Sequence, residues 1–287
     1  MRIPRYWARQ DYTGVGRNGK SQTISAWGWS VLSQTDAQAH AVARAKSALD
    51  KLAAGDHPSD YDYLERPLRE EIVENISVGD EEIALITRNR YGALVLNCAD
   101  VCFVDVDFPP VRGRGLVDGF LLAFSAARRR ARMQAGEQST LEKVRAWARN
   151  HPGRSFRLYR TAAGLRLLFT DRLYDPTAGE TGTLLAELES DELYRRLTLK
   201  QESFRARLTA KPWRCGCSQP PNRYPRETPK TQEMFAQWLA TYEAQAGGRA
   251  VCRLVEAIGE PARHEGIRTV VEVHDQYTCT QEAGELV

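Results

Sequence analysis

The chain lacks the long apolar runs that membrane-spanning helices require. Among its 287 residues no stretch of about 18 or more consecutive apolar side chains occurs, so we expect no transmembrane helix and no membrane partner. The first seven residues, Met-Arg-Ile-Pro-Arg-Tyr-Trp, have none of the apolar character of a signal peptide. We therefore expect a cytoplasmic protein.

Cysteine is scarce, and its spacing does not form a disulfide framework. The six cysteines lie at positions 98, 102, 215, 217, 252 and 279, a scatter that fits a reducing compartment. Cys215 and Cys217 could supply two thiolates to zinc, with Cys252, His264 or His274 completing the site. Their spacing is C-x-C and no second pair follows, so a tight turn with free thiols is favoured over a zinc cofactor.

No Walker A sequence occurs, which argues against a P-loop.

Lysine is scarce among the basic residues. Seven of the 40 basic residues are lysine, so 33 are arginine, while the net charge is only +3. Arginine binds phosphate and carboxylate through paired hydrogen bonds. Arginine is dense in residues 112–172 and 195–226, whereas acidic residues are concentrated in 56–82. This asymmetry predicts a basic face built by the second half of the chain.

Hydrophobic periodicity predicts both helices and hairpins. Strands are expected at 2–9 paired with 21–30, at 71–77, 82–88, 92–97 and 100–107, and at 156–160 paired with 165–169. Helices are expected over 35–52, 118–133, 139–150, most of 179–208, and 231–246. Residues 251–258 fit a strand or a helix, and 267–274 fit a strand. The pattern predicts an α+β fold, a mainly antiparallel sheet covered by helices.

Two domains are predicted, although they could equally form one continuous domain. Residues 1–80 are expected to form an N-terminal hairpin–helix module, and residues 81–287 an α+β domain. Residues 209–230 contain five prolines and few apolar side chains. They predict a long ordered loop that could dock a protein partner.

The most informative stretch is residues 101–110, Val-Cys-Phe-Val-Asp-Val-Asp-Phe-Pro-Pro. Asp105 and Asp107 are two residues apart, so in a strand they point to the same face, and the prolines end that strand. Adjacent carboxylates repel each other unless a cation such as Mg²⁺ or Mn²⁺ lies between them. The pair therefore predicts either a metal site for phosphoryl transfer or a strand end whose aspartates only cap a loop.

Short motifs within residues 92–215 resemble those of the archaeo-eukaryotic primase (primase-polymerase) superfamily. Asp105 and Asp107 match the DxD that binds metal in that family. Thr161-Ala-Ala-Gly-Leu-Arg166 resembles the phosphate-contacting hairpin Ser/Thr-x-Gly-Gly-x-His in outline, with arginine in place of the histidine. Ser190-Asp-Glu-Leu-Tyr194, followed by Phe204-Arg-Ala-Arg207 and Lys211, resembles the third motif. The blocks 3–7, 26–30 and 204–215 also resemble a bacterial family of no assigned activity.

The resemblance implies a primase-polymerase-like fold that binds nucleotide or nucleic acid and transfers nucleotidyl groups with Mg²⁺ or Mn²⁺. In that scheme Asp105 and Asp107 hold the metal, and Asp191 is the third catalytic carboxylate. Phosphates would be bound beside the glycine-bearing turn by Arg160 and Arg166. A nucleic-acid track would be lined by Arg205, Arg207, Lys211 and Arg214.

Two features of the sequence support an alternative. An arginine cannot replace the tunable imidazole of histidine, so Arg166 favours a degenerate, non-catalytic module that binds nucleic acid or a partner within a larger assembly. Asp191 stands near the start of an expected helix, where aspartate is a routine cap. Its match to the third motif is therefore open to a purely structural interpretation.

Overall fold

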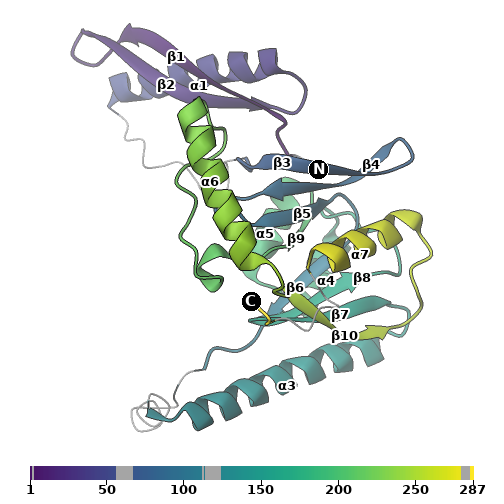
Figure 1. Cartoon of the computed structure of the whole chain (residues 1–287). Coiled ribbons are helices and arrows are strands. Elements are labelled where there is room, and N and C mark those ends of the chain that lie inside the picture. The colour runs from purple at the N-terminus through teal and green to yellow at the C-terminus, as the bar shows by residue number, and fades with distance from the viewer. Residues whose placement is uncertain (2, 56–66, 112, 114–123, 279–284) are drawn as a thin grey trace.

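The computed structural model describes residues 1, 3–55, 67–111, 113, 124–278 and 285–287, and these residues form an α+β fold (Figure 1). The strands are β1 (Tyr6–Val15), β2 (Ser21–Ser30), β3 (Glu71–Val78), β4 (Glu81–Arg88), β5 (Leu94–Cys98), β6 (Phe103–Asp107), β7 (Phe156–Thr161), β8 (Gly164–Phe169), β9 (Phe204–Arg207) and β10 (Cys252–Ile258). The helices are α1 (Gln34–Ala54), α3 (Ala126–Asn150), α4 (Gly179–Glu187), α5 (Glu192–Gln201), the 3₁₀ turn η3 (Pro212–Arg214), α6 (Pro229–Ala246) and α7 (Glu265–Tyr277).

Strands β1 and β2 form an antiparallel hairpin against which α1 packs. The helix begins at Ser33, whose side chain accepts a hydrogen bond from the Asp36 amide, and ends at Gly55. The small side chains Ala37 and Ala41 are completely buried against the hairpin. A Cβ at Gly28 would lie 2.2 Å from the Ala41 nitrogen, so only glycine permits this close packing. We refer to this part of the chain as the β1–β2–α1 unit.

Two four-stranded antiparallel sheets form the rest of the molecule. Their strand orders are β10-β7-β8-β6 and β3-β4-β5-β9. Side chains connect the two sheets. The Tyr194 hydroxyl of α5 donates to the Phe103 carbonyl of β6 at 3.0 Å and accepts from the Arg205 amide of β9 at 3.4 Å, and Arg166 of β8 donates to the Arg207 carbonyl of β9 at 2.9 Å. One hydrophobic cluster includes buried residues of both sheets, so the sheets share a single core.

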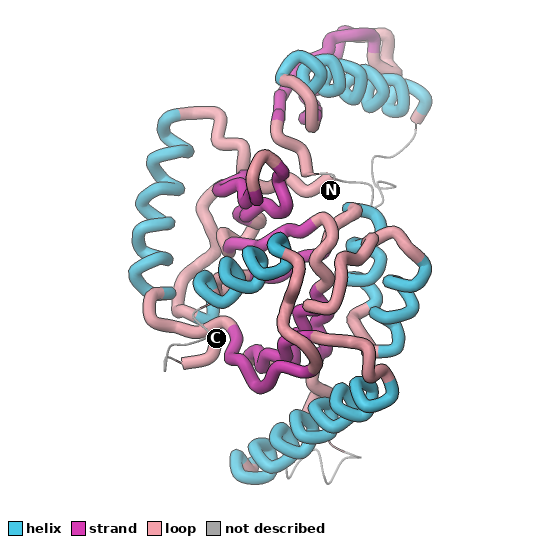
Figure 2. The backbone as a smooth tube through the Cα atoms, turned by 90° about the vertical axis from the view of Figure 1, so that its right-hand side faces the viewer, coloured by secondary structure: helices cyan, strands magenta, loops and turns pink. Residues whose placement is uncertain are grey.

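Helices cover this core. Helix α3 contributes Val144 and Trp147, and the Trp147 ring lies 6.0 Å from Phe169. Helix α7 contributes Ile267 and Val270, both completely buried. The β1–β2–α1 unit lies at one end of the molecule and α3 at the opposite end (Figures 1 and 2). In the described part of the chain no helix combines the length and apolarity needed to cross a membrane.

The predicted α+β class and antiparallel sheets are confirmed, but the strand predicted at 267–274 is wrong. These residues lie in α7. Ile267, Val270 and His274 are buried, and this spacing of three and four residues is helical. The β-branched side chains favoured a strand in the sequence, and packing against the core determined the outcome.

Two other predicted helices need correction. Helix α3 continues without a break through residues 134–138, and the start of the predicted helix 118–133 lies outside the described residues. Residues 204–207 are not helical but form β9, where Phe204 and Ala206 are buried and the two arginines are not.

The boundary predicted after residue 80 falls in the turn between β3 and β4, which pair with each other.

Candidate functional site

Asp105 and Asp107 lie on the edge strand β6, next to β8. Asp105 is opposite Arg166 and Asp107 is opposite Gly164 in the register of the two strands. Val106, between the aspartates, is buried, whereas Asp105 is partly exposed and Asp107 is exposed. This alternation places both carboxylates on the face of β6 opposite to that of Val106, the same face as the buried Phe103.

Asp105 forms a two-bond ion pair with Arg166. The Arg166 Nε donates to Asp105 Oδ1 at 2.7 Å, and Nη2 donates to Oδ2 at 3.0 Å. The Arg166 side chain is 3% exposed and that of Asp105 is 41% exposed. Burial would lower the pKa of Arg166, but the adjacent Asp105 carboxylate outweighs it and raises that pKa above its ordinary value. The pair thus satisfies an arginine charge inside the protein.

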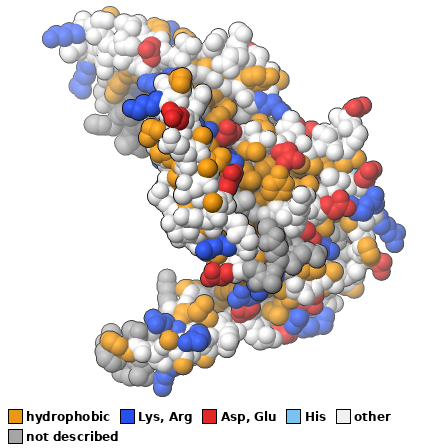
Figure 3. Space-filling model, viewed as in Figure 1, with side chains coloured by type: hydrophobic (Ala, Val, Ile, Leu, Met, Phe, Trp, Pro, Cys, Tyr) orange, Lys and Arg blue, Asp and Glu red, His pale blue; other side chains and the backbone are white. Residues whose placement is uncertain are grey.

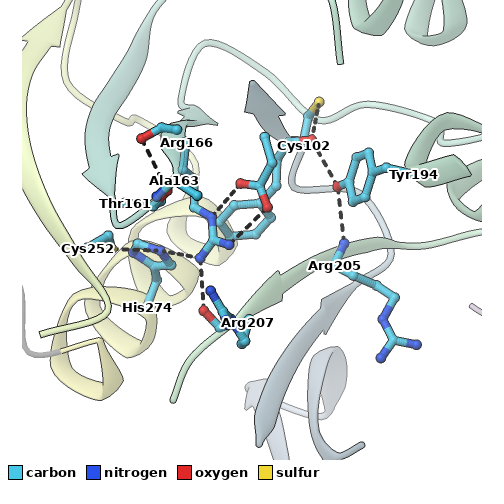
Figure 4. Close-up of polar contacts among 12 residues, drawn as sticks. Cys102, Thr161, Ala163, Arg166, Tyr194, Arg205, Arg207, Cys252 and His274 are labelled. Atoms are coloured by element: carbon cyan, nitrogen blue, oxygen red, sulfur yellow. Dashed lines mark hydrogen bonds and ion pairs between the residues drawn. The ribbon is translucent and has the colours of Figure 1, made fainter. Parts of the chain in front are cut away.

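The third nitrogen of Arg166 also faces protein groups. Nη1 donates to the Arg207 carbonyl at 2.9 Å and lies 3.5 Å from His274 Nε2. Figure 4 shows the guanidinium between the Arg207 backbone and the His274 ring. His274 is completely buried, and burial lowers its pKa. Arg166 therefore connects β8 to β6, β9 and α7, and each of its nitrogens has a protein partner in this structure.

Asp107 lies among other carboxylates. Partial burial raises the pKa of Asp107, the charges of Asp105 and Asp191 raise it further, and the charge of Lys211 lowers it. Asp191 is the N-cap of α5, where its side chain accepts a hydrogen bond from the Tyr194 amide at 2.9 Å. Within the described residues, no three His, Cys, Asp or Glu side chains are close enough together to hold a metal ion.

A group of basic side chains lies beside these carboxylates. Burial, followed by the charges of Arg166 and Arg214, lowers the pKa of Arg207 to about 10. Burial together with Arg207 and Arg214 also lowers the pKa of Lys211. We term the three side chains Arg207, Lys211 and Arg214 the basic cluster. No described carboxylate forms an ion pair with any of them. Such mutual repulsion between cations is relieved when an anion binds.

An exposed aromatic residue lies within the basic cluster. Trp213 is 48% exposed and stands in η3 between Lys211 and Arg214 in the sequence. The Lys211 Nζ lies 5.5 Å from the centroid of its ring, and the Tyr91 ring meets it edge-on at 5.3 Å. An exposed tryptophan flanked by cations is the composition of a base-stacking surface.

Two predicted phosphate or nucleic-acid ligands lie elsewhere, each paired with a carboxylate. Arg160 donates to both carboxylate oxygens of Glu137 on α3. Arg205 donates to both oxygens of Glu70, at 2.9 and 2.8 Å. The structure thus brings the three predicted aspartates together with Arg166 and the basic cluster, but it directs the side chains of Arg160 and Arg205 toward other partners.

The sequence did not connect two residues with this site: His274 was considered as a possible zinc ligand, and Trp213 was given no role. His274 comes from α7, 108 residues after Arg166, and no local signal connects the two. Trp213 had a visible signal, because it interrupts a basic run in Lys-Pro-Trp-Arg. An aromatic residue between cations in a predicted loop is a sign of a stacking surface.

Among the residues that the structure describes, the cysteines considered for zinc belong to no group of three potential ligands. The Cys217 thiol donates to Gln245 Oε1 at 2.7 Å, and Cys252 lies 3.8 Å from His274 Nε2. His264 caps α7, where it accepts a hydrogen bond from the Gly266 amide. Cys279 lies outside the described residues. These contacts are those of packed thiols and a helix cap.

Comparison with known proteins adds no relative. No protein-family model, no curated protein and no solved structure matches this chain.

Proposed function

We propose that the chain is a nucleic-acid-binding protein of the primase-polymerase type in which binding does not depend on a metal ion. In this proposal the two-sheet body is the primase-polymerase-like part, and the β1–β2–α1 unit is an N-terminal module attached to it. Asp105 serves the structure by pairing with Arg166, and the basic cluster contacts the phosphates.

The ion pair between Arg166 and Asp105 is the observation that carries this proposal. Both oxygens of Asp105 accept hydrogen bonds from an arginine that is 3% exposed. A metal at Asp105 would lie beside a permanent positive charge, since arginine does not deprotonate in proteins. The same strand position holds histidine in the family that the motifs resemble, and histidine can be neutral.

The basic cluster supplies the binding surface. Lys211 and Arg214 have no carboxylate partner among the described residues, and Trp213 between them is 48% exposed. Cations bind the phosphates of any sequence, and an exposed tryptophan stacks on any base. This supports binding of single-stranded nucleic acid without strong sequence preference.

Metal-dependent nucleotidyl transfer is the second candidate function. It is favoured by the position of Asp107, whose pKa is raised by partial burial and then by the neighbouring charges of Asp105 and Asp191. A carboxylate in such a position gains from a divalent cation. This candidate requires Mg²⁺ or Mn²⁺ to bind at Asp107 despite the Arg166–Asp105 pair.

Fluorescence anisotropy of a labelled single-stranded oligonucleotide tests the proposed surface. We expect Lys211→Glu and Arg214→Glu each to weaken binding by about tenfold, and binding by the wild type to fall steeply between about 50 mM and about 200 mM salt. Arg149→Glu, an exposed arginine on α3, is the matched control and should bind as the wild type does. Unchanged binding by both cluster variants would overturn the proposal.

A further inference from the structure

A cavity of about 800 Å³ lies where the β1–β2–α1 unit meets the rest of the molecule. Its walls come from β1, β2 and α1 on one side, and from the end of β4, helix α5 and the loop 220–226 on the other. None of Asp105, Asp107 and the basic cluster lines it. Its volume lies within the range of roughly 300–1,000 Å³ of small-molecule sites.

The walls of this cavity are basic and aromatic. Seven arginines and six aromatic residues line it, with Glu70 as the one carboxylate among the lining residues. Glu70 is already bound by Arg205 through two hydrogen bonds. Figure 3 shows basic and hydrophobic side chains together where α6 approaches the β1–β2–α1 unit. The cavity therefore suits an anion that carries an aromatic or apolar group.

One wall concentrates positive charge over a tryptophan ring. The Arg69 guanidinium lies 4.3 Å from the centroid of the Trp27 ring. Burial lowers the pKa of Arg69, and the nearby charge of Arg223 lowers it further, while the charge of Glu227 opposes this lowering. Within the described residues neither Arg69 nor the exposed Arg223 has a carboxylate at ion-pair distance. An anion at this wall would relieve the repulsion between the two arginines.

Unpartnered polar atoms also occur in the residues that line the cavity. Trp7 Nε1 and Arg226 Nε are buried donors without a hydrogen-bond partner in the described residues, and Gln201 Oε1 and Asn222 Oδ1 are buried acceptors of the same kind. Trp7 is only 9% exposed. Buried polar atoms are normally satisfied, so the residues around this cavity retain donors and acceptors that their own side chains leave unused.

We propose that this cavity binds one nucleotide unit, with its base among the aromatic side chains and its phosphate at Arg69 and Arg223. A base offers a flat aromatic face together with donors and acceptors on its edge, and a phosphate matches the arginine fork. The unit is either a free nucleotide or one nucleotide of a single strand. This goes beyond the proposed function, because the cavity shares no residue with the aspartates or the basic cluster.

Tryptophan fluorescence of the full chain tests this inference, since three of the six tryptophans line the cavity. The probes are AMP, adenosine, inorganic phosphate and a short single-stranded DNA oligonucleotide. We expect AMP or the oligonucleotide to quench the emission, and adenosine and phosphate alone to bind at least about tenfold more weakly. Quenching by AMP identifies a free nucleotide as the ligand. Quenching by the oligonucleotide alone identifies a strand in the cavity if Trp27→Leu diminishes it, because the exposed Trp213 can also be quenched by a bound strand.

Variants locate the binding in the cavity. Arg223→Glu should weaken the quenching ligand by about tenfold and should fold normally, because Arg223 is exposed and unpaired in the described residues. Trp27→Leu should do the same by removing a stacking face. Arg149→Glu, far from the cavity on α3, should have no effect.

Distinct results separate this inference from the proposed function. Lys211→Glu should weaken the oligonucleotide but leave AMP unaffected. If Arg223→Glu and Trp27→Leu bind every probe as the wild type does, or if no probe quenches the emission, the cavity inference is overturned. Binding of phosphate as tight as that of AMP would overturn it as well.

Discussion

Arg166 carries its charge inside the protein, and Asp105 makes that possible. A buried guanidinium without a partner would lose several kcal/mol of hydration, whereas here two carboxylate oxygens and a backbone carbonyl accept its hydrogen bonds. Histidine at this position could become neutral and release the carboxylate. Arginine cannot, so the substitution at one position changes what the aspartate is able to do.

Removal of Asp105 should therefore destabilise the fold. We expect Asp105→Ala to lower the free energy of unfolding by about 2–3 kcal/mol, below the roughly 3–5 kcal/mol of a fully buried pair because water reaches Asp105. The double variant Asp105→Ala/Arg166→Met should recover most of this loss, since it removes the unpaired charge as well. Urea denaturation followed by circular dichroism measures both values.

Asp107→Ala is the matched control for this prediction. Asp107 is exposed, and its replacement should change the free energy of unfolding by no more than about 0.5 kcal/mol. Equal stabilities of the Asp105→Ala and Asp107→Ala proteins would contradict the structural role that we assign to the ion pair.

At the scale of the elements, the site depends on how closely β6 and β8 approach each other. A Cβ at Gly164 would lie 2.2 Å from the Val106 carbonyl oxygen. Gly164→Ala should push the strands apart, misplace Arg166 relative to Asp105 and destabilise the fold by about 1–3 kcal/mol. Thermal unfolding tests this against Gly153→Ala, where a Cβ meets nothing within 4 Å. Identical melting of the two variants would refute the argument.

Some elements could be predicted from the sequence and others could not. The hairpin β7–β8 has two short, mainly apolar runs around a glycine-bearing turn, and its prediction needed no distant information. Helix α7 was misread because Val270, Val271 and Val273 favour strands locally. Strand β9 is only four residues long and directly follows a helix, so its pairing with β5 decides its conformation.

Some features of the candidate site could likewise be predicted from the sequence, and others could not. The shared face of Asp105 and Asp107 follows from their two-residue spacing. The partner of Asp105 depends on the register between β6 and β8, which joins residues 61 positions apart. The motif resemblance suggested Arg166 as a phosphate ligand, but only the register shows that its guanidinium meets the aspartate.

At the scale of the whole molecule, the informative feature is the location of the basic side chains that no described carboxylate pairs with. The net charge is only +3, and many arginines are held by carboxylates, as Arg5 is by Glu82 between the β1–β2–α1 unit and β4. The basic cluster and the Arg69–Arg223 wall are the two exceptions that we have described. They lie on either side of Tyr91, which lines the cavity and contacts Trp213. A single strand could therefore contact both.

The most direct test of the account is the affinity for a single-stranded oligonucleotide with and without divalent metal. Anisotropy titrations of the full chain in excess EDTA and in Mn²⁺ should give dissociation constants that agree within about twofold, because phosphate contacts by lysine and arginine need no metal. Asp107→Ala should behave as the wild type does in both. Binding that disappears in EDTA, returns with Mn²⁺ and is lost in Asp107→Ala would contradict the account and establish the aspartates as a metal site.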